Sequence, residues 1–146
     1  MIVFEHPLTA IIPNYINIYN SINWTESGTA MISGTVTIKY SIVHEPIAGM
    51  GNIVAHPNFV DADGPDNLAG TLDDDLRLQR TSPAYNTGSN TYIWPDIVDI
   101  DGDGDTFDPV PLDLDYRARV VYGTVDMGAY EIPSGPFSVY GPLIVR

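Results

Sequence analysis

Two stretches of the chain carry the same alternation of apolar and polar residues, displaced by 20 residues. Residues 15–24 and 35–42 both alternate with a period of two, which is the period of a β-strand. One face of the first stretch holds Ile16, Ile18, Ile22 and Trp24, and Asn20 falls on it as well. The displacement aligns Ile16 with Val36, Ile18 with Ile38, Ser21 with Ser41, and Ile22 with Ile42. A strand that recurs at a period of about 20 to 50 residues predicts a solenoid, in which each turn covers the open edge of the one before.

The composition favours the same fold class. With 13 Gly, 12 Pro and 9 Tyr among 146 residues, the chain is rich in turn formers and in an aromatic residue that favours strands. No window keeps a 3.6-residue apolar period, and proline interrupts most candidate helices. The sequence therefore predicts an all-β protein of one domain's length. An antiparallel hairpin remains the alternative for residues 15–42, although a link of about a dozen residues is long for one.

The net charge of −13 is unevenly distributed. Residues 1–60 hold three Glu and Lys39 and sum to −2, residues 61–126 hold fifteen Asp and four Arg and sum to −11, and the remainder sums to zero. Every Asp lies between Asp61 and Asp126, often beside Gly or Pro. This pattern indicates turns and cation-binding loops. The acidity argues against nucleic acid as a partner, because a phosphate backbone requires a basic face.

The loop that begins at Asp99 has a carboxylate at every second position, followed by Gly104. Oxygen ligands at this spacing can surround one Ca²⁺, as in the first half of an EF-hand loop. The twelfth position holds Val110 instead of the bidentate Glu of an EF-hand, so a later or earlier aspartate must replace it, either Asp108 or Asp96. We therefore predict a Ca²⁺ site formed by Asp99, Asp101, Asp103, Asp105 and Asp108. The alternative is a solvated acidic turn.

The other charged groups of this half of the chain are interpreted structurally. A second acidic cluster, Asp61–Asp66 with Asp73–Asp75, has irregular spacing and is expected to form solvated turns. The four arginines of residues 61–126 could clamp an anionic sugar. Pairing with Asp113, Asp115 or Asp126 is favoured, because fifteen Asp face four Arg.

The run Arg119–Glu131 is predicted to form a short strand pair. Its segment Gly123–Glu131, GTVDMGAYE, resembles the choice-of-anchor Q C-terminal region of exported bacterial proteins, which follows a right-handed parallel β-helix of the pectin-lyase-like type. Further likeness lies in Asn20–Trp24, Gly34–Val43, Gly51–Asp61 and Leu76–Ala84, so that the resemblance covers residues 16–131. The chain departs from the family at His56, which stands in place of an acidic residue, and at Tyr116–Ala118, which replaces a Gly-Asn-Pro turn.

This resemblance implies the C-terminal turns of a right-handed parallel β-helix, followed by a loop-rich cap with short strands. We expect an irregular lead-in at residues 1–15, terminal β-helix turns at 16–60, an Asp-rich cap at 61–131 that includes a strand at Thr91–Trp94, and a tail at 132–146. The expected function is non-catalytic: a Ca²⁺-stabilised capping segment of a secreted or cell-surface protein, with a polysaccharide or another cell-surface component as partner. We expect the signal peptide upstream of Met1, and no segment is long and apolar enough to span a bilayer.

Two alternatives stay open. The first is an enzyme, a polysaccharide lyase or glycoside hydrolase whose active turns lie upstream. It requires clustered charges on an outward strand face, and residues 16–60 offer only Glu26, Lys39 and Glu45. The second is a carbohydrate-binding or adhesive module that presents Tyr92 and Trp94 to sugars. Fold analogy cannot separate these functions, because β-helices support many.

Overall fold

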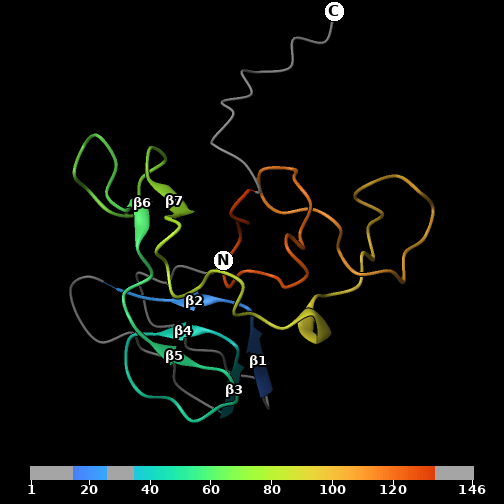
Figure 1. The fold of residues 1–146 in the computed structure, drawn as a ribbon, viewed down its shortest axis with the longest axis horizontal. Coiled ribbons are helices and arrows are strands. Elements are labelled where there is room, and N and C mark those ends of the chain that lie inside the picture. Colours follow the sequence, from blue (N-terminus) through green and yellow to red (C-terminus); the bar gives the residue numbers. More distant parts are fainter. Residues whose placement is uncertain (1–14, 26–34, 134–146) are drawn as a thin grey trace, which may run out of the picture.

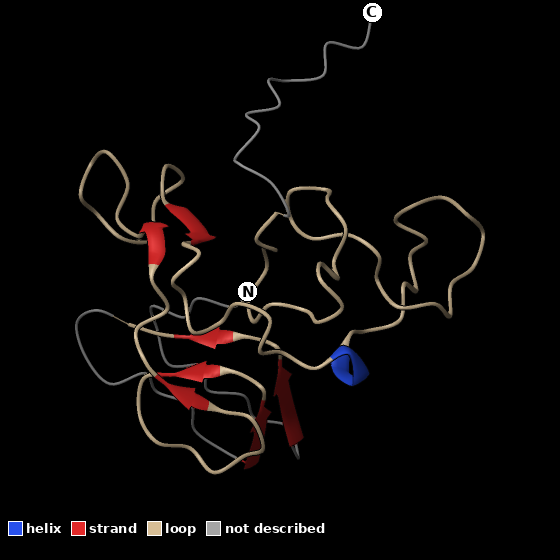
Figure 2. Cartoon of the chain, in the orientation of Figure 1, coloured by secondary structure: helices blue, strands red, loops and turns tan. Residues whose placement is uncertain are grey.

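The computed structural model describes residues 15–25 and 35–133, so most of the predicted lead-in, the link at residues 26–34 and the tail from residue 134 lie outside the described residues. Short strands joined by long loops and turns make up the described chain, which contains no α-helix (Figure 2). The all-β prediction is confirmed. The elements are β1 (Tyr15–Tyr19), β2 (Ile22–Asn23), β3 (Thr35–Lys39), β4 (Ile42–Val43), β5 (Ile53–Val54), β6 (Phe59–Asp61), β7 (Asp75–Leu78) and the 3₁₀ helix η1 (Asn90–Tyr92).

The strands of the two repeats pair in parallel, in the register that the 20-residue displacement predicts. β1 pairs with β3 so that Ile16 lies opposite Val36, and β2 pairs with β4 so that Ile22 lies opposite Ile42. β5 joins the second sheet beside β4, which gives the order β2-β4-β5 (Figure 1). An antiparallel hairpin at residues 15–42 is therefore excluded.

A bend separates the two strands of each repeat. Asn20 and Tyr40 adopt left-handed backbone conformations, with φ of 47° and 49°, and Gly51 does so with φ of 72°. Each stands two residues before the isoleucine that enters the second sheet. The prediction that residues 15–24 form one continuous strand face is therefore wrong. Asn tolerates the left-handed region better than most residues, which explains its place in an otherwise apolar pattern.

Polar side chains replace main-chain pairing at this bend. The amide of Ser21 donates to the Ser41 hydroxyl at 3.2 Å, and the amide of Ser41 donates to the side-chain oxygen of Asn52 at 3.3 Å. Ser41 is completely buried. A ladder of small polar residues thus satisfies buried donors where the backbone turns away from its neighbours.

One hydrophobic core joins the two halves of the chain. Its buried members are Ile22, Ile42, Leu78, Ala84, Met127 and Ile132. The core therefore crosses the predicted boundary between residues 60 and 61. It also extends past residue 131, because Ile132 is buried although we assigned it to the tail.

The loop-rich half contacts the first bend directly. Asn20 exchanges two hydrogen bonds with the backbone of Ser89, at 2.7 and 2.9 Å, and its carbonyl accepts from the amide of Gly128 at 2.9 Å. A side chain on Gly128 would contact Ile22 closely, so a glycine lets the two segments approach. Residues 84–89 and 125–132 thus contact the first of the two repeats, around Asn20 and Ile22.

Two strand predictions in this half are wrong. Residues 90–92 form η1, not the strand Thr91–Trp94. The run Arg119–Glu131 forms no strand pair, since the described structure has only an isolated bridge there, between Val121 and Thr124. The amides of Asp126 and Glu131 bond to buried carboxylates, whereas those of Arg119, Met127 and Gly128 bond to main-chain carbonyls of separate loops. No helix of the described residues is long and apolar enough to cross a membrane.

Candidate metal centre

The predicted Ca²⁺ loop projects from the body of the molecule and is closed at its base. Pro95 and Pro109 form an antiparallel bridge, and on either side the amide of Asp96 donates to the Asp108 carbonyl and that of Val110 to the Trp94 carbonyl, both at 2.8 Å. Residues 97–107 form the projecting part (Figure 1). No helix flanks this loop, in contrast to an EF-hand.

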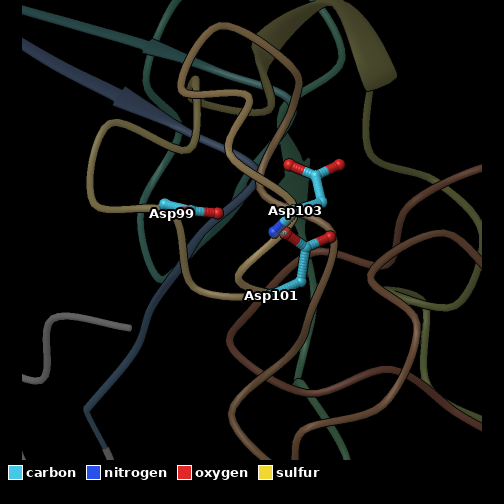
Figure 3. A group of neighbouring side chains, drawn as sticks. All are labelled: Asp99, Asp101 and Asp103. Atoms are coloured by element: carbon cyan, nitrogen blue, oxygen red, sulfur yellow. Dashed lines mark hydrogen bonds between the residues drawn. The ribbon is translucent and has the colours of Figure 1, made fainter.

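Three of the five predicted ligands come together in the loop. Asp99, Asp101 and Asp103 each offer a carboxylate oxygen, and these oxygens lie within 4.8 Å of one another. Figure 3 shows the Asp99 side chain pointing towards the other two. Left-handed conformations at Asp99, Gly102 and Gly104 produce the tight turns that bring them together. Such a group suits a hard cation that prefers oxygen ligands.

The other two predicted ligands, Asp105 and Asp108, lie outside this group of three. Asp105 accepts from the amide of Phe107 at 2.9 Å, which holds the end of the loop in a turn. Asp108 is partly buried, and one of its carboxylate oxygens is buried without a hydrogen-bond partner. Its desolvation, and then the negative charges of Asp103, Asp105 and Asp101, raise the pKa of Asp108 above its ordinary value.

Asp96 adds a second buried carboxylate to the same loop. It is fully buried, and one oxygen accepts from the amide of Ile100 at 2.7 Å, so the carboxylate faces the first turn of the loop. Its other oxygen has no hydrogen-bond partner. A buried carboxylate oxygen without a donor is costly unless a cation neutralises it. The unpartnered oxygens of Asp96 and Asp108 therefore favour a cation near the loop. Asp108 was among the five predicted ligands, whereas Asp96 was indicated only as a possible substitute for the missing glutamate.

The second acidic cluster forms exposed turns between Ala62 and Asp74, as predicted, but its first and last members do not: Asp61 ends β6 and Asp75 begins β7, and the two lie opposite each other in an antiparallel pair. The Asp74 carboxylate accepts from the amide of Gly70 at 2.7 Å, and Asp73 accepts from the Thr71 hydroxyl. This hydroxyl bond lowers the pKa of Asp73. The carboxylates thus have donors of their own on an exposed loop.

Arg77, Arg117 and Arg119 pair with acidic residues, as the structural interpretation predicts, and Arg80 donates to the carbonyl of Pro133. Arg77 binds both oxygens of Asp115 at 2.8 Å and also reaches Asp75 at 3.1 Å, so it ties β7 to the turn after Asp113. The paired hydrogen bond with Arg77 lowers the pKa of Asp115. Arg117 approaches Asp115 at 3.6 Å, and Arg119 pairs with Glu131 instead of with an aspartate.

Three buried carboxylates organise the segment that carries the family resemblance. Asp126 accepts from the amides of Asn86 and Ile132, at 2.6 and 2.8 Å, and Glu131 accepts from the amide of Asp126 and from Arg119. Asp113 accepts from three amides, those of Asp115, Arg117 and Glu131. This role was not predicted from the sequence, although the spacing of Asp113 two and four residues before two of its donors is typical of a turn that a side chain caps.

We expect this cluster to make the protein more stable at mildly acidic pH than at pH 8. Burial and the neighbouring Asp126 charge raise the pKa of Glu131 to about 8, with Arg119 opposing them. A folded-state pKa above the unfolded value means that the folded protein holds a proton that the unfolded chain releases, so this stability is present below pH ~4.5 and is lost towards pH ~8. The free energy of unfolding should fall by up to about 1.4 kcal/mol per pH unit. Urea titrations from pH 5 to 8 test this, and Glu131→Gln should flatten the slope; an equal slope in the variant would contradict it.

A separate aromatic cluster surrounds the single lysine. The Lys39 ammonium donates to the Tyr92 hydroxyl at 3.3 Å, and Tyr92 stacks on Tyr19 with ring centroids 4.2 Å apart. The hydrogen bond to Tyr92 raises the pKa of Lys39. The described contacts of Lys39 thus serve to hold η1 against the parallel strands.

Comparison of the chain with family models, with curated proteins and with solved structures finds no match.

Proposed function

We propose that this chain is the C-terminal part of a right-handed parallel β-helix, of the choice-of-anchor Q type, from a secreted or surface-attached bacterial protein. The observation that carries the proposal is the parallel pairing of β1 with β3 and of β2 with β4 at a 20-residue displacement. The recurring left-handed bend at Asn20 and Tyr40 supports it, because stacked turns of a solenoid repeat their corners. The proposed fold does not by itself indicate an enzymatic activity, because β-helices support many functions.

The function proposed for residues 61–132 is structural. These residues contribute Leu78, Ala84 and Met127 to the core that also contains Ile22 and Ile42, so they cover apolar surface that two short turns could not bury alone. Solenoid ends require such a covering segment for solubility. A Ca²⁺ ion in the loop of Asp99, Asp101 and Asp103 would neutralise the most acidic part of this segment and stabilise it.

The test is thermal unfolding in the presence of Ca²⁺ and in the presence of a chelator. Unfolding is followed by the fluorescence of a tryptophan that lies beside the parallel strands. A Trp94→Phe background leaves Trp24, which packs on the core, as the only tryptophan reporter. With about 10 mM Ca²⁺, a hundredfold excess over a dissociation constant of ~10⁻⁴ M, we expect about 2.7 kcal/mol of stabilisation and a melting temperature raised by about 5 to 10 °C.

Two double variants make this test specific. The variant Asp101→Asn/Asp103→Asn keeps side-chain oxygens that can accept hydrogen bonds from the amides of the turn, but it removes two negative charges. It should abolish the Ca²⁺-induced rise of the melting temperature. Asp61→Asn/Asp63→Asn removes two exposed charges of the other acidic cluster and should leave the shift intact. Binding of Ca²⁺ without any shift of the Trp24 transition would contradict a stabilising role, and the absence of binding would exclude the cation.

The alternative functions remain predictions. Lys39, the charged residue that the lyase alternative requires, is bonded to the hydroxyl of Tyr92, and no described contact gives it a carboxylate partner. Of the two aromatic residues in the carbohydrate-binding alternative, Tyr92 packs against Tyr19, whereas Trp94 is exposed. Neither arrangement favours these functions over a structural one.

A further inference from the structure

The loop that carries the carboxylates also exposes large apolar side chains. Phe107 is 90% exposed and Ile97 75% exposed, and Val98 and Ile100 are exposed as well. The bridge between Pro95 and Pro109 closes the loop at its base, so Ile97 and Phe107 stand on its two opposite limbs. Single exposed apolar residues are common on soluble proteins, but a concentration of them in one projecting loop marks an interaction surface.

The charge of the loop restricts the partners that this surface can meet. Residues 96–108 contain six aspartates and no lysine or arginine, so the loop alone repels an anionic surface. A divalent cation held by Asp99, Asp101 and Asp103 offsets part of this negative charge and places a positive centre at the loop surface, where an anionic oxygen can approach it. Asp101 and Asp103 are exposed, and Ca²⁺ takes six to eight oxygen ligands, so coordination positions remain for oxygens from outside the protein. The unpartnered oxygen of the fully buried Asp96 is the independent sign that the loop takes a cation.

We propose that this loop docks on an anionic phospholipid surface, where a bound divalent cation bridges its carboxylates to lipid phosphates and Ile97, Val98 and Phe107 enter the interfacial layer. The inference rests on the proposed cation site. A phospholipid surface offers phosphate oxygens and an apolar layer within about 10 Å, so both features of the loop are satisfied together. A soluble anion would satisfy only the cation, and an apolar protein pocket would satisfy only the side chains.

Vesicle co-sedimentation of the full chain tests this inference. Vesicles of phosphatidylcholine with phosphatidylglycerol should retain the protein with Ca²⁺ and release it with chelator, whereas vesicles of phosphatidylcholine alone should not retain it. Phe107→Ser and Ile97→Ser should each weaken the binding by about tenfold, since each removes an apolar side chain from the interface without touching a carboxylate. Leu72→Ser, which alters a fully exposed apolar residue on another loop, is the matched control and should bind like the wild type.

The melting temperature, measured on the same samples, separates this inference from the proposed function. A Ca²⁺-induced shift without vesicle binding would overturn the docking and leave the cation site intact, and the absence of both would overturn both. Retention without Ca²⁺, or equal retention on neutral vesicles, would also overturn the docking. Ca²⁺-dependent self-association that Phe107→Ser abolishes, seen by light scattering without vesicle binding, would assign the surface to a second copy of the chain instead.

Discussion

Replacing Asp126 by alanine should lower the free energy of unfolding by about 2 to 6 kcal/mol, because it leaves one buried and one partly buried amide without an acceptor at about 1 to 3 kcal/mol each. The Asp126 carboxylate is 1% exposed and receives both the Asn86 amide and the Ile132 amide. These donors come from segments 46 residues apart, since 132 − 86 = 46. Their loss therefore removes a link between the segment after Ala84 and the end of the core.

The matched control is Asp66→Ala. Asp66 makes the same kind of bond, from a carboxylate oxygen to the amide of Leu68 at 2.9 Å, but on an exposed loop. Water can replace that acceptor, so the cost should stay below about 1 kcal/mol. Urea denaturation at pH 6 measures both variants. If both substitutions lowered the free energy of unfolding equally, the burial of Asp126 would not be what determines its contribution to stability.

The architecture of residues 15–54 was largely predictable from the sequence, whereas its bends were not. A period of two and a displacement of 20 residues are visible without a structure, because pairing in a parallel sheet aligns like side chains. The left-handed bend at Tyr40 could not be seen, since tyrosine rarely adopts this conformation and only the matching position of Asn20 points to it. The pairing of β5 with β4 could not be foreseen either, because Ile53 follows Ile42 by only 11 residues and so breaks the displacement of 20.

In residues 61–132, the group of neighbouring carboxylates could be predicted from the sequence, but the contacts between distant segments could not. Aspartates beside glycines identified the projecting loop and the group of Asp99, Asp101 and Asp103, because local spacing determines which oxygens can meet. Asp96 and Asp126 are buried through contacts that depend on distant segments, and composition gives no indication of burial for an aspartate. The run Arg119–Glu131 looks like strands because it is rich in β-formers, yet its amides find acceptors in loops, and two of these acceptors are the carboxylates of Asp113 and Glu131.

Replacing Ile42 by alanine should cost about 2 to 5 kcal/mol, the range for an aliphatic side chain removed from a close-packed core. Ile42 is completely buried and lies between Ile22 and Ile53 in the parallel sheet, with Met127 in the same core. The melting temperature should fall by about 5 to 15 °C for a chain of this size. Val54→Ala is the control: Val54 lies in the same sheet but is half exposed, so its truncation should cost less than about 1 kcal/mol.

The same variant decides whether the two halves form one cooperative unit. Ile42 belongs to the parallel strands, whereas its core partners Ala84 and Met127 belong to the loop-rich half. If one core holds both, Ile42→Ala should lower the protection from amide exchange equally at Ile53 and at Met127, because both amides then exchange through the same global opening. Loss of protection at Ile53 with unchanged protection at Met127 would mean that the loop-rich half stays folded without the strands. That outcome would contradict its role as a covering segment, because a segment that covers a core derives its own stability from the same apolar contacts.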